Sequence, residues 1–172
     1  ITDESLRNAI KLINNSERPF IYAGGGVGIS EATEELISFA EKINAPVSTS
    51  LMGISFFSIN HELYTGMIGM HGTKASNIGA TKCDLLITLG ARFSDRVISN
   101  QSHIKNAKIL HIDVDPAEIN KNIKVDACIV GDLKIALQKL TPLVERKNNS
   151  EWIQSINEIT VKDISIPKNI TT

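Results

Sequence analysis

The amino-acid sequence predicts an α/β fold, namely a doubly wound, Rossmann-like parallel sheet of five to six strands with helices on both faces. Short apolar runs at 85–89 and 108–112 are stopped by Gly90 and Asp113. Such runs are typical of strands that are buried on both faces of a parallel sheet. Segments with helical periodicity alternate with these runs along the chain, as successive βαβ units require.

The composition is that of a globular protein, and its charge balance gives no sign of a strongly charged partner. The chain has 172 residues, of which 42% are hydrophobic and 22% charged, and its formal net charge is −1. This balance gives no reason to expect nucleic acid or a membrane as a partner. The first residues carry acids and lack the apolar core of a signal peptide, so we expect a cytoplasmic protein. Cys83 and Cys128 form no CxxC pair and are expected to be reduced and buried.

The first third of the chain predicts a helix followed by a βαβ unit. Thr2 or Asp3 can cap a helix that must end before Pro19. A strand at 19–23, a glycine turn at 24–28, a helix capped by Ser30 and a strand at 46–49 follow. The crossover between these two strands should be right-handed.

The segment 50–71 is expected to be a long loop with short elements, because it has little helical periodicity and contains three glycines. Loops of this length are usually functional or insertions. It contains an apolar cluster, for which subunit or domain contact and ordinary core packing both remain open. The members of this cluster are Leu51, Met52, Ile54, Phe56 and Phe57.

The remaining elements complete the alternating pattern. We expect a short helix within 72–82, a helical turn at 116–120, a strand at 128–130 and a helix that Asp132 caps. Polarity rises after Lys147, and 151–162 has the pattern of a separate helix. The predicted domain is therefore 1–147, followed by a linker and helix at 148–172.

Glycine, arginine and aspartate residues follow several predicted strands, and ligands of open parallel sheets bind at those carboxyl ends. Gly24, Gly25 and Gly26 do not complete a GxGxxG pattern, so a phosphate-binding turn and a tight packing turn have similar weight. Gly90 and Asp113 are 23 residues apart in the sequence. That distance is close to the roughly 20 residues between a phosphate loop and a ribose-binding acid.

Two interpretations of the segment after 90 remain open. In the first, Arg92 contacts a phosphate and Asp113 or Asp115 holds a ribose. In the second, Arg92 and Arg96 pair with Asp95 or Asp113, and Asp115 only caps the turn after it. The repetition of such residues at three strand ends favours a nucleotide site.

The histidines have no metal-binding spacing, and no hydrolytic triad is apparent. His111 lies within a predicted strand and is expected to be a core residue, whereas His71 is a candidate for facing a ligand. We expect no catalytic residue and no metal ligand in this chain.

Five separated motifs occur in a fixed order along the chain. They are TSLMG at 49–53, IGMHG at 68–72, GARFSDR at 90–96, HIDVD at 111–115 and GD at 131–132. Together they resemble the central domain of the catalytic subunit of acetolactate (acetohydroxyacid) synthase, a thiamine-diphosphate enzyme family. The resemblance covers about 1–147.

The resemblance implies an FAD site in this domain, and it puts Asp95 and Arg96 near the mouth of the substrate channel. Ser50 and Ser94 replace the threonine and aspartate that are frequent in the family, but both keep a hydrogen-bonding side chain. The implied FAD contacts are Gly24, Gly25, Gly26, Ser50, Leu51, Ile68, Gly69, Met70, His71, Gly90, Ala91, Arg92, Phe93, Ser94, Asp113, Val114, Gly131 and Asp132.

The family condenses two pyruvate molecules, or pyruvate and 2-oxobutanoate, with decarboxylation in branched-chain amino-acid biosynthesis. The resemblance implies that thiamine diphosphate and Mg²⁺ bind to domains before and after this one, since the chain contains no Gly-Asp-Gly motif. We therefore expect an excised middle domain that binds FAD and is inactive alone. Its implied partners are the other domains of the subunit, identical subunits in a homodimer or homotetramer, and a regulatory small subunit.

Two alternatives remain. The chain could be the middle domain of another thiamine-diphosphate enzyme, such as glyoxylate carboligase or a pyruvate oxidase, although Arg92 and the 70–72 motif favour the anabolic synthase by resemblance. It could also be a non-catalytic module for NAD or ADP-ribose. The missing GxGxxG pattern and the missing acid after the second strand argue against that module.

Overall fold

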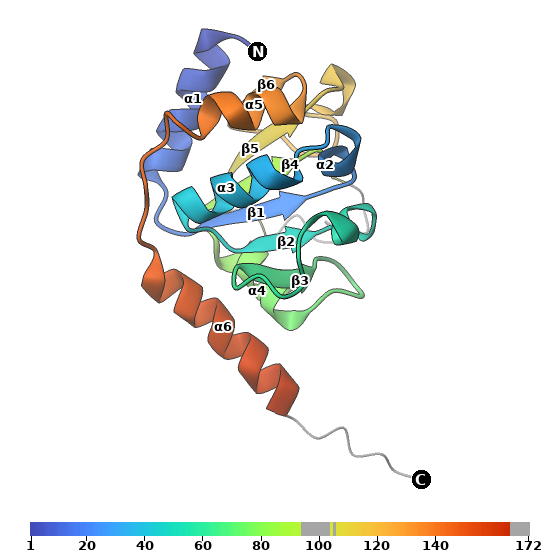
Figure 1. Ribbon diagram of the computed structural model, residues 1–172, viewed down its shortest axis with the longest axis vertical. Coiled ribbons are helices and arrows are strands. Elements are labelled where there is room, and N and C mark those ends of the chain that lie inside the picture. The colour runs from blue at the N-terminus through green and yellow to red at the C-terminus, as the bar shows by residue number, and fades with distance from the viewer. Residues whose placement is uncertain (94–103, 105, 166–172) are drawn as a thin grey trace.

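The computed structural model describes residues 1–93, 104 and 106–165. Across these residues, six parallel strands form one sheet in the order β3-β2-β1-β4-β5-β6 (Figure 1). This arrangement confirms the predicted doubly wound parallel sheet. The strands are β1 (Pro19–Ala23), β2 (Val47–Thr49), β3 (Tyr64–Met67), β4 (Leu85–Leu89), β5 (Lys108–Asp113) and β6 (Ala127–Val130).

Helices cover both faces of the sheet. One buried cluster joins α1 (Asp3–Asn15), α2 (Gly26–Ile29), α3 (Thr33–Ile43) and α5 (Leu133–Leu140) to one face. A second cluster joins α4 (Lys74–Lys82) and α6 (Ser150–Ser165) to the other face. Two short 3₁₀ helices, η1 (Leu51–Phe56) and η3 (Pro116–Glu118), follow β2 and β5.

The core depends on strands that are apolar on both sides. Every residue of β4 is buried, with Leu85, Ile87 and Leu89 in the first cluster and Leu86 in the second. Burying such a side chain contributes roughly 1.5–3 kcal/mol relative to leaving it exposed. Because both faces of these strands must be covered, the continuous apolar run forces helices onto both sides of the sheet.

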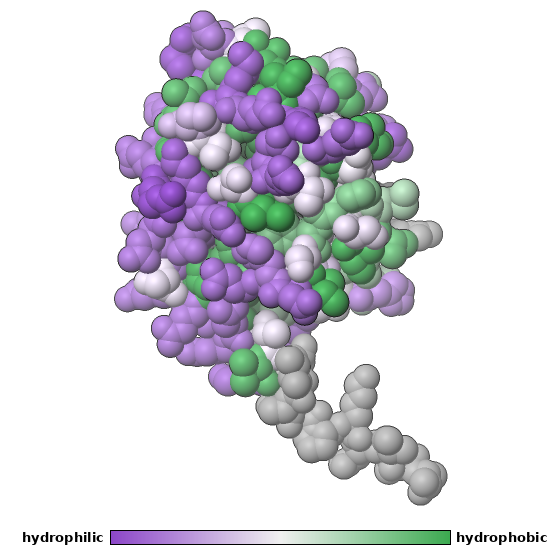
Figure 2. Space-filling model, in the orientation of Figure 1, coloured by the Kyte–Doolittle hydropathy of each residue, from purple (hydrophilic) through white to green (hydrophobic). Residues whose placement is uncertain are grey.

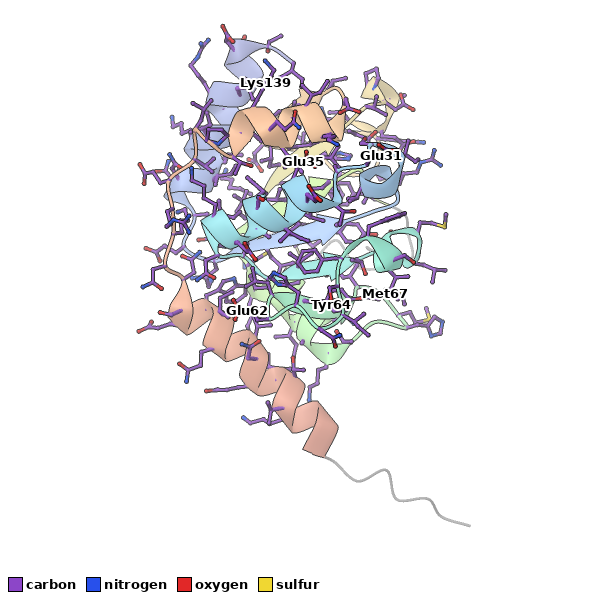
Figure 3. The ribbon with its side chains drawn as sticks, viewed as in Figure 1. Glu31, Glu35, Glu62, Tyr64, Met67 and Lys139 are labelled. Carbon is purple, nitrogen blue, oxygen red and sulfur yellow. The ribbon has the colours of Figure 1, made fainter. Side chains whose placement is uncertain are left out.

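One local expectation was wrong. Ser30 does not cap the long helix but ends α2, and α3 begins after Ala32. The helical conformation is interrupted between α2 and α3, where Glu31 has a left-handed φ of 52°. The segment 50–71, expected to be a long loop with short elements, contains two such elements, η1 and the edge strand β3. The first and last residues of β3, Tyr64 and Met67, are labelled in Figure 3.

The helix α6 packs against α4, and Figure 1 shows it running along the β3 side of the molecule. The Trp152 side chain is buried, and its Nε1 donates a hydrogen bond of 2.9 Å to the carbonyl of Pro19. The preceding linker is fixed as well, because Lys147 Nζ donates to the carbonyls of Asn14 (2.8 Å) and Ser16 (2.5 Å). The domain boundary near Lys147 stays a prediction.

None of the helices in the described part of the chain combines the length and apolar character that crossing a membrane requires.

Candidate functional site

The strand order reverses between β1 and β4, which makes the carboxyl ends of these two strands the topological switch point of the sheet. Ligands of doubly wound folds bind in the crevice at this point. The turns that leave the two strands are joined directly by backbone hydrogen bonds. The Gly24 N–H donates to Leu89 O at 2.9 Å, and the Gly26 N–H donates to Gly90 O at 3.0 Å.

Glycine is required at this junction for space. A Cβ atom added to Gly24 would lie 2.4 Å from Gly90 O, and one added to Gly26 would lie 2.7 Å from Gly90 Cα. These glycines therefore let the two turns pack against each other, which favours the packing interpretation of the glycine turn. A ligand contact by Gly24, Gly25 or Gly26 stays a prediction.

The segment after β2 lies against the same junction. The Ser50 N–H donates to Ala23 O at 2.9 Å, and Ser50 Oγ caps η1 by accepting from the Gly53 N–H at 3.1 Å. The predicted apolar cluster is divided by the fold. Phe57 is buried, whereas the side chains of Leu51 and Met52 are 71% and 75% exposed. Figure 2 shows hydrophobic surface on the side of the molecule where Figure 1 places α2 and η1.

The turn after β3 presents two exposed side chains. Ile68 is buried, and its N–H donates to Thr49 O at 3.2 Å. Met70 is 81% exposed and His71 is also exposed. Gly69, between Ile68 and Met70, is held by the side chain of Asn77 in α4, a residue that the sequence reasoning missed. The only sequence signal for Asn77 was its position shortly after a helix cap, next to a glycine-rich turn.

The turn after β4 is anchored by the buried residues before and after Arg92. Ala91 and Phe93 are buried, and the Phe93 ring meets the His111 ring edge-on with centroids 5.2 Å apart. The Arg92 side chain is 79% exposed, and its Nε lies 3.6 Å from Glu118 Oε1. Of the two partners that the pairing interpretation allowed for Arg92, Asp113 is not the one it contacts here, and Asp95 lies outside the described residues. The predicted residues Ser94, Asp95 and Arg96 lie outside the described residues.

A row of buried polar side chains crosses the sheet just below this edge. Tyr22, Thr88 and His111 are neighbours in register on β1, β4 and β5, and all three are buried. Burial raises the pKa of Tyr22 to about 12, although a hydrogen bond with Ser50 lowers it slightly, so the phenol stays protonated. Among the described residues, neither Thr88 Oγ1 nor His111 Nδ1 has a hydrogen-bond partner.

His111 is a core histidine, as predicted. Desolvation by burial lowers its pKa, and the nearby Asp113 carboxylate opposes this shift. Its Nε2 lies 3.2 Å from Ala91 O and 3.6 Å from Asp113 Oδ2. A neutral imidazole with its proton on Nε2 can donate to Ala91 O, and this bond connects the turn after β4 to strand β5.

The aspartates after β5 and β6 are engaged in local hydrogen bonds. Asp113 Oδ1 accepts from the Asp115 N–H at 2.9 Å, and Asp115 caps η3 by accepting from Ala117. The capping interpretation of Asp115 is therefore confirmed. Asp132 caps α5, and the Gly131 N–H donates to Asp113 O at 3.0 Å. Between these turns, the Val114 side chain is 68% exposed.

The structure thus brings the predicted segments to one edge of the sheet. Residues 24–26 contact 90, residues 50–53 contact the end of β1, and 131 contacts 113. A separate hollow of about 530 Å³ lies between α6 and the residues before β3 and is lined by Leu63, Ile153 and Val161, among others. None of the predicted site residues lines it, so we regard the carboxyl edge as the candidate site.

Comparison with known proteins agrees with this architecture. The chain is 50% identical over 166 residues to a protein of Methanocaldococcus jannaschii named probable acetolactate synthase large subunit, covering 94% of this chain and 28% of that relative. It is 41% identical over 159 residues to the acetolactate synthase large subunit of Lactococcus lactis, covering 91% and 28%. It is 40% identical over 174 residues to the chloroplastic acetolactate synthase 2 of Nicotiana tabacum, covering 97% and 26%.

The chain therefore spans less than a third of the length of these relatives. A family model described as the central domain of thiamine pyrophosphate enzymes matches residues 6–140. This match confirms the resemblance predicted from the five motifs. The chain belongs to the family of thiamine pyrophosphate enzyme central domains.

Proposed function

We propose that the chain is the central domain of an acetolactate synthase large subunit and that it binds FAD at the carboxyl edge of its sheet. The main support is the convergence of the predicted segments at the β1–β4 switch point, next to exposed apolar side chains. The names of the relatives support the choice of synthase, because three of them carry that name.

The chemistry of the edge fits a flavin nucleotide. Leu51, Met52 and Met70 expose apolar side chains, which suit the face of an aromatic ring system. Arg92 offers an exposed guanidinium, which suits a pyrophosphate. When bound, FAD would supply a flavin, but the reaction of this family has no net redox change, so its role here is structural.

The parent enzyme is proposed to condense two pyruvate molecules, or pyruvate with 2-oxobutanoate, with loss of carbon dioxide. Thiamine diphosphate and Mg²⁺ would be held by other domains of the subunit. The proposed partners are those domains, identical subunits in a homodimer or homotetramer, and a regulatory small subunit. The proposed location is the cytoplasm. Synthase turnover by the pure 172-residue chain would contradict the proposal that it is inactive alone.

A titration of the purified chain with FAD, monitored by flavin and Trp152 fluorescence, tests the proposal. We expect saturable binding that Arg92→Ala weakens roughly 10- to 100-fold, as the loss of a charge-assisted hydrogen bond of about 1.5–3 kcal/mol predicts. Arg7→Ala is the matched control, because Arg7 is exposed on α1 and no predicted site residue lies on that helix. Equal affinity of both variants would contradict the role of Arg92.

The second candidate is a module for NAD or ADP-ribose. The strand order 3-2-1-4-5-6 favours it, because dinucleotide-binding domains share this order. The residues that follow β2, Ser50 and Leu51, contain no acid for a ribose hydroxyl. Competition of NAD or ADP-ribose with FAD distinguishes the two candidates, and preferential binding of either competitor would overturn the FAD proposal.

A further inference from the structure

The side chain of Asn77 makes two hydrogen bonds with the backbone of a single residue. Its Oδ1 accepts from the Gly69 N–H at 2.9 Å, and its Nδ2 donates to the Gly69 carbonyl at 2.9 Å. An amide side chain carries one acceptor and one donor group in a fixed plane, so it can bind both polar groups of one residue at once. Asn77 therefore acts as a clamp on Gly69.

The clamped residue has a backbone conformation that is specific to glycine. Gly69 has a φ of 114°, a region that L-residues with a side chain rarely adopt. Its carbonyl also accepts from the Gly72 N–H at 2.9 Å. The turn between β3 and α4 has no regular ladder of hydrogen bonds, so the clamp supplies two of the bonds that define its shape.

The helix that carries the clamp is itself fixed to the sheet. Thr73 caps α4 by accepting from the Ser76 N–H at 3.1 Å and donates to Thr65 O at 2.6 Å. The hydroxyls of Ser76 and Thr65 lie 2.7 Å apart, and the Ser76 side chain is fully buried. Asn77 is thus held against strand β3, and it connects the position of the turn to the position of the sheet.

We propose that Asn77 is a positioning residue for the ligand edge. By holding both polar groups of Gly69, it fixes the direction in which Met70 and His71 leave the turn, and both side chains are exposed there. This inference rests on the proposed FAD site, to which it adds a residue that the five motifs do not contain. Asn77 itself need not touch the ligand.

The first test is backbone hydrogen exchange in the purified chain, which needs no ligand. Asn77→Ala removes both hydrogen bonds, and each is worth roughly 2- to 10-fold in an equilibrium. We expect exchange at the Gly69 and Gly72 amides to accelerate about 5- to 100-fold, with β1 and β4 unchanged. Asn77→Asp keeps the acceptor but loses the donor, and should accelerate exchange by no more than Asn77→Ala does. Unchanged exchange at the Gly69 and Gly72 amides in Asn77→Ala would overturn the clamp.

The second test is the FAD titration, which separates positioning from stability. Asn77→Ala should weaken FAD binding several-fold and alter the fluorescence of the bound flavin, whereas a purely structural role would lower the Tm and leave the affinity of the folded protein unchanged. Asn157→Ala is the matched control, because Asn157 is an exposed asparagine in α6. It controls for the gain in helix propensity that replacing asparagine with alanine brings.

The outcomes distinguish the two proposals. Faster exchange together with unchanged FAD affinity would overturn the positioning role of Asn77. Absence of FAD binding by the unmodified chain would overturn the proposed function, while the exchange result would still decide whether Asn77 holds the turn.

Discussion

The close contact between the two glycine turns at the switch point can be tested by adding a side chain where the structure leaves no room for one. In Gly24→Ala the new Cβ would lie 2.4 Å from Gly90 O and 2.5 Å from Ala91 Cβ. Ordinary contacts of a Cβ begin at 3.4 Å, so the overlap is about 1 Å. These neighbours are backbone atoms and the first side-chain atom of a turn that is anchored at the end of β4, and they cannot rotate away.

Overpacking of this kind typically costs 1–3 kcal/mol, and we expect about 3 kcal/mol because the neighbours are fixed. For a protein of this size, each kcal/mol lowers the Tm by roughly 2–4 °C, which predicts a decrease of about 6–12 °C. Urea unfolding followed by Trp152 fluorescence should show a lower midpoint at an unchanged slope.

The adjacent glycine provides the control. In Gly25→Ala the new Cβ would lie 3.1 Å from Met52 Cβ, so the overlap is only about 0.3 Å and a small shift of the exposed segment that carries Met52 relieves it. The backbone at Gly25 has φ −62° and ψ −21°, which alanine adopts readily. We expect a change below about 1 kcal/mol, partly offset by the lower entropy of the unfolded chain. Equal stability of the two variants would refute the steric argument.

Three further predictions follow from buried groups. Trp152→Phe leaves the Pro19 carbonyl without its donor and should cost about 1–3 kcal/mol in urea unfolding, and an unchanged midpoint would contradict the docking of α6. Burial raises the pKa of Cys83 to about 12, so iodoacetamide at pH 8 should label the half-buried Cys128 well before Cys83 by mass spectrometry, and equal labelling would contradict this. Burial lowers the pKa of His111 below its ordinary value of 6.5, so the unfolded chain binds the proton first. The contribution of the neutral His111 side chain to stability should be complete above about pH 6.5. It should be lost as the pH falls towards the folded-state pKa, at up to about 1.4 kcal/mol per pH unit. His111→Gln should flatten this dependence, and an unchanged pH profile of unfolding would count against it.

Several elements could be predicted because their signals lie within a few residues. Thr2 caps α1 through a capping box with Ser5, and Asp132 caps α5. The strand β4 was predicted with its exact bounds, since an apolar run that a glycine ends needs no information from elsewhere in the chain. By contrast, β3 is a four-residue edge strand that contains Gly66 and has no apolar run, so only its pairing with β2 makes it a strand.

The candidate site was predictable as an edge but not as a set of contacts. The rule for parallel sheets places the residues after β1, β4 and β5 together, because the carboxyl ends of parallel strands share one side. Sequence spacing did not indicate that Arg92 would approach Glu118, or that Asn77 would hold Gly69. Such pairs depend on how two turns approach each other after the sheet has formed.

The sequence by itself determined the parallel α/β architecture, the caps of α1 and α5 and the family, because each follows from local patterns of apolar, glycine and capping residues or from short motifs. Tertiary structure alone decided that Gly24 and Gly26 serve the close approach to Gly90, and that α6 docks on the domain through Trp152. The physical reason is distance along the chain. Packing and hydrogen bonds between residues far apart in sequence depend on the relative positions of whole elements, which no local pattern specifies.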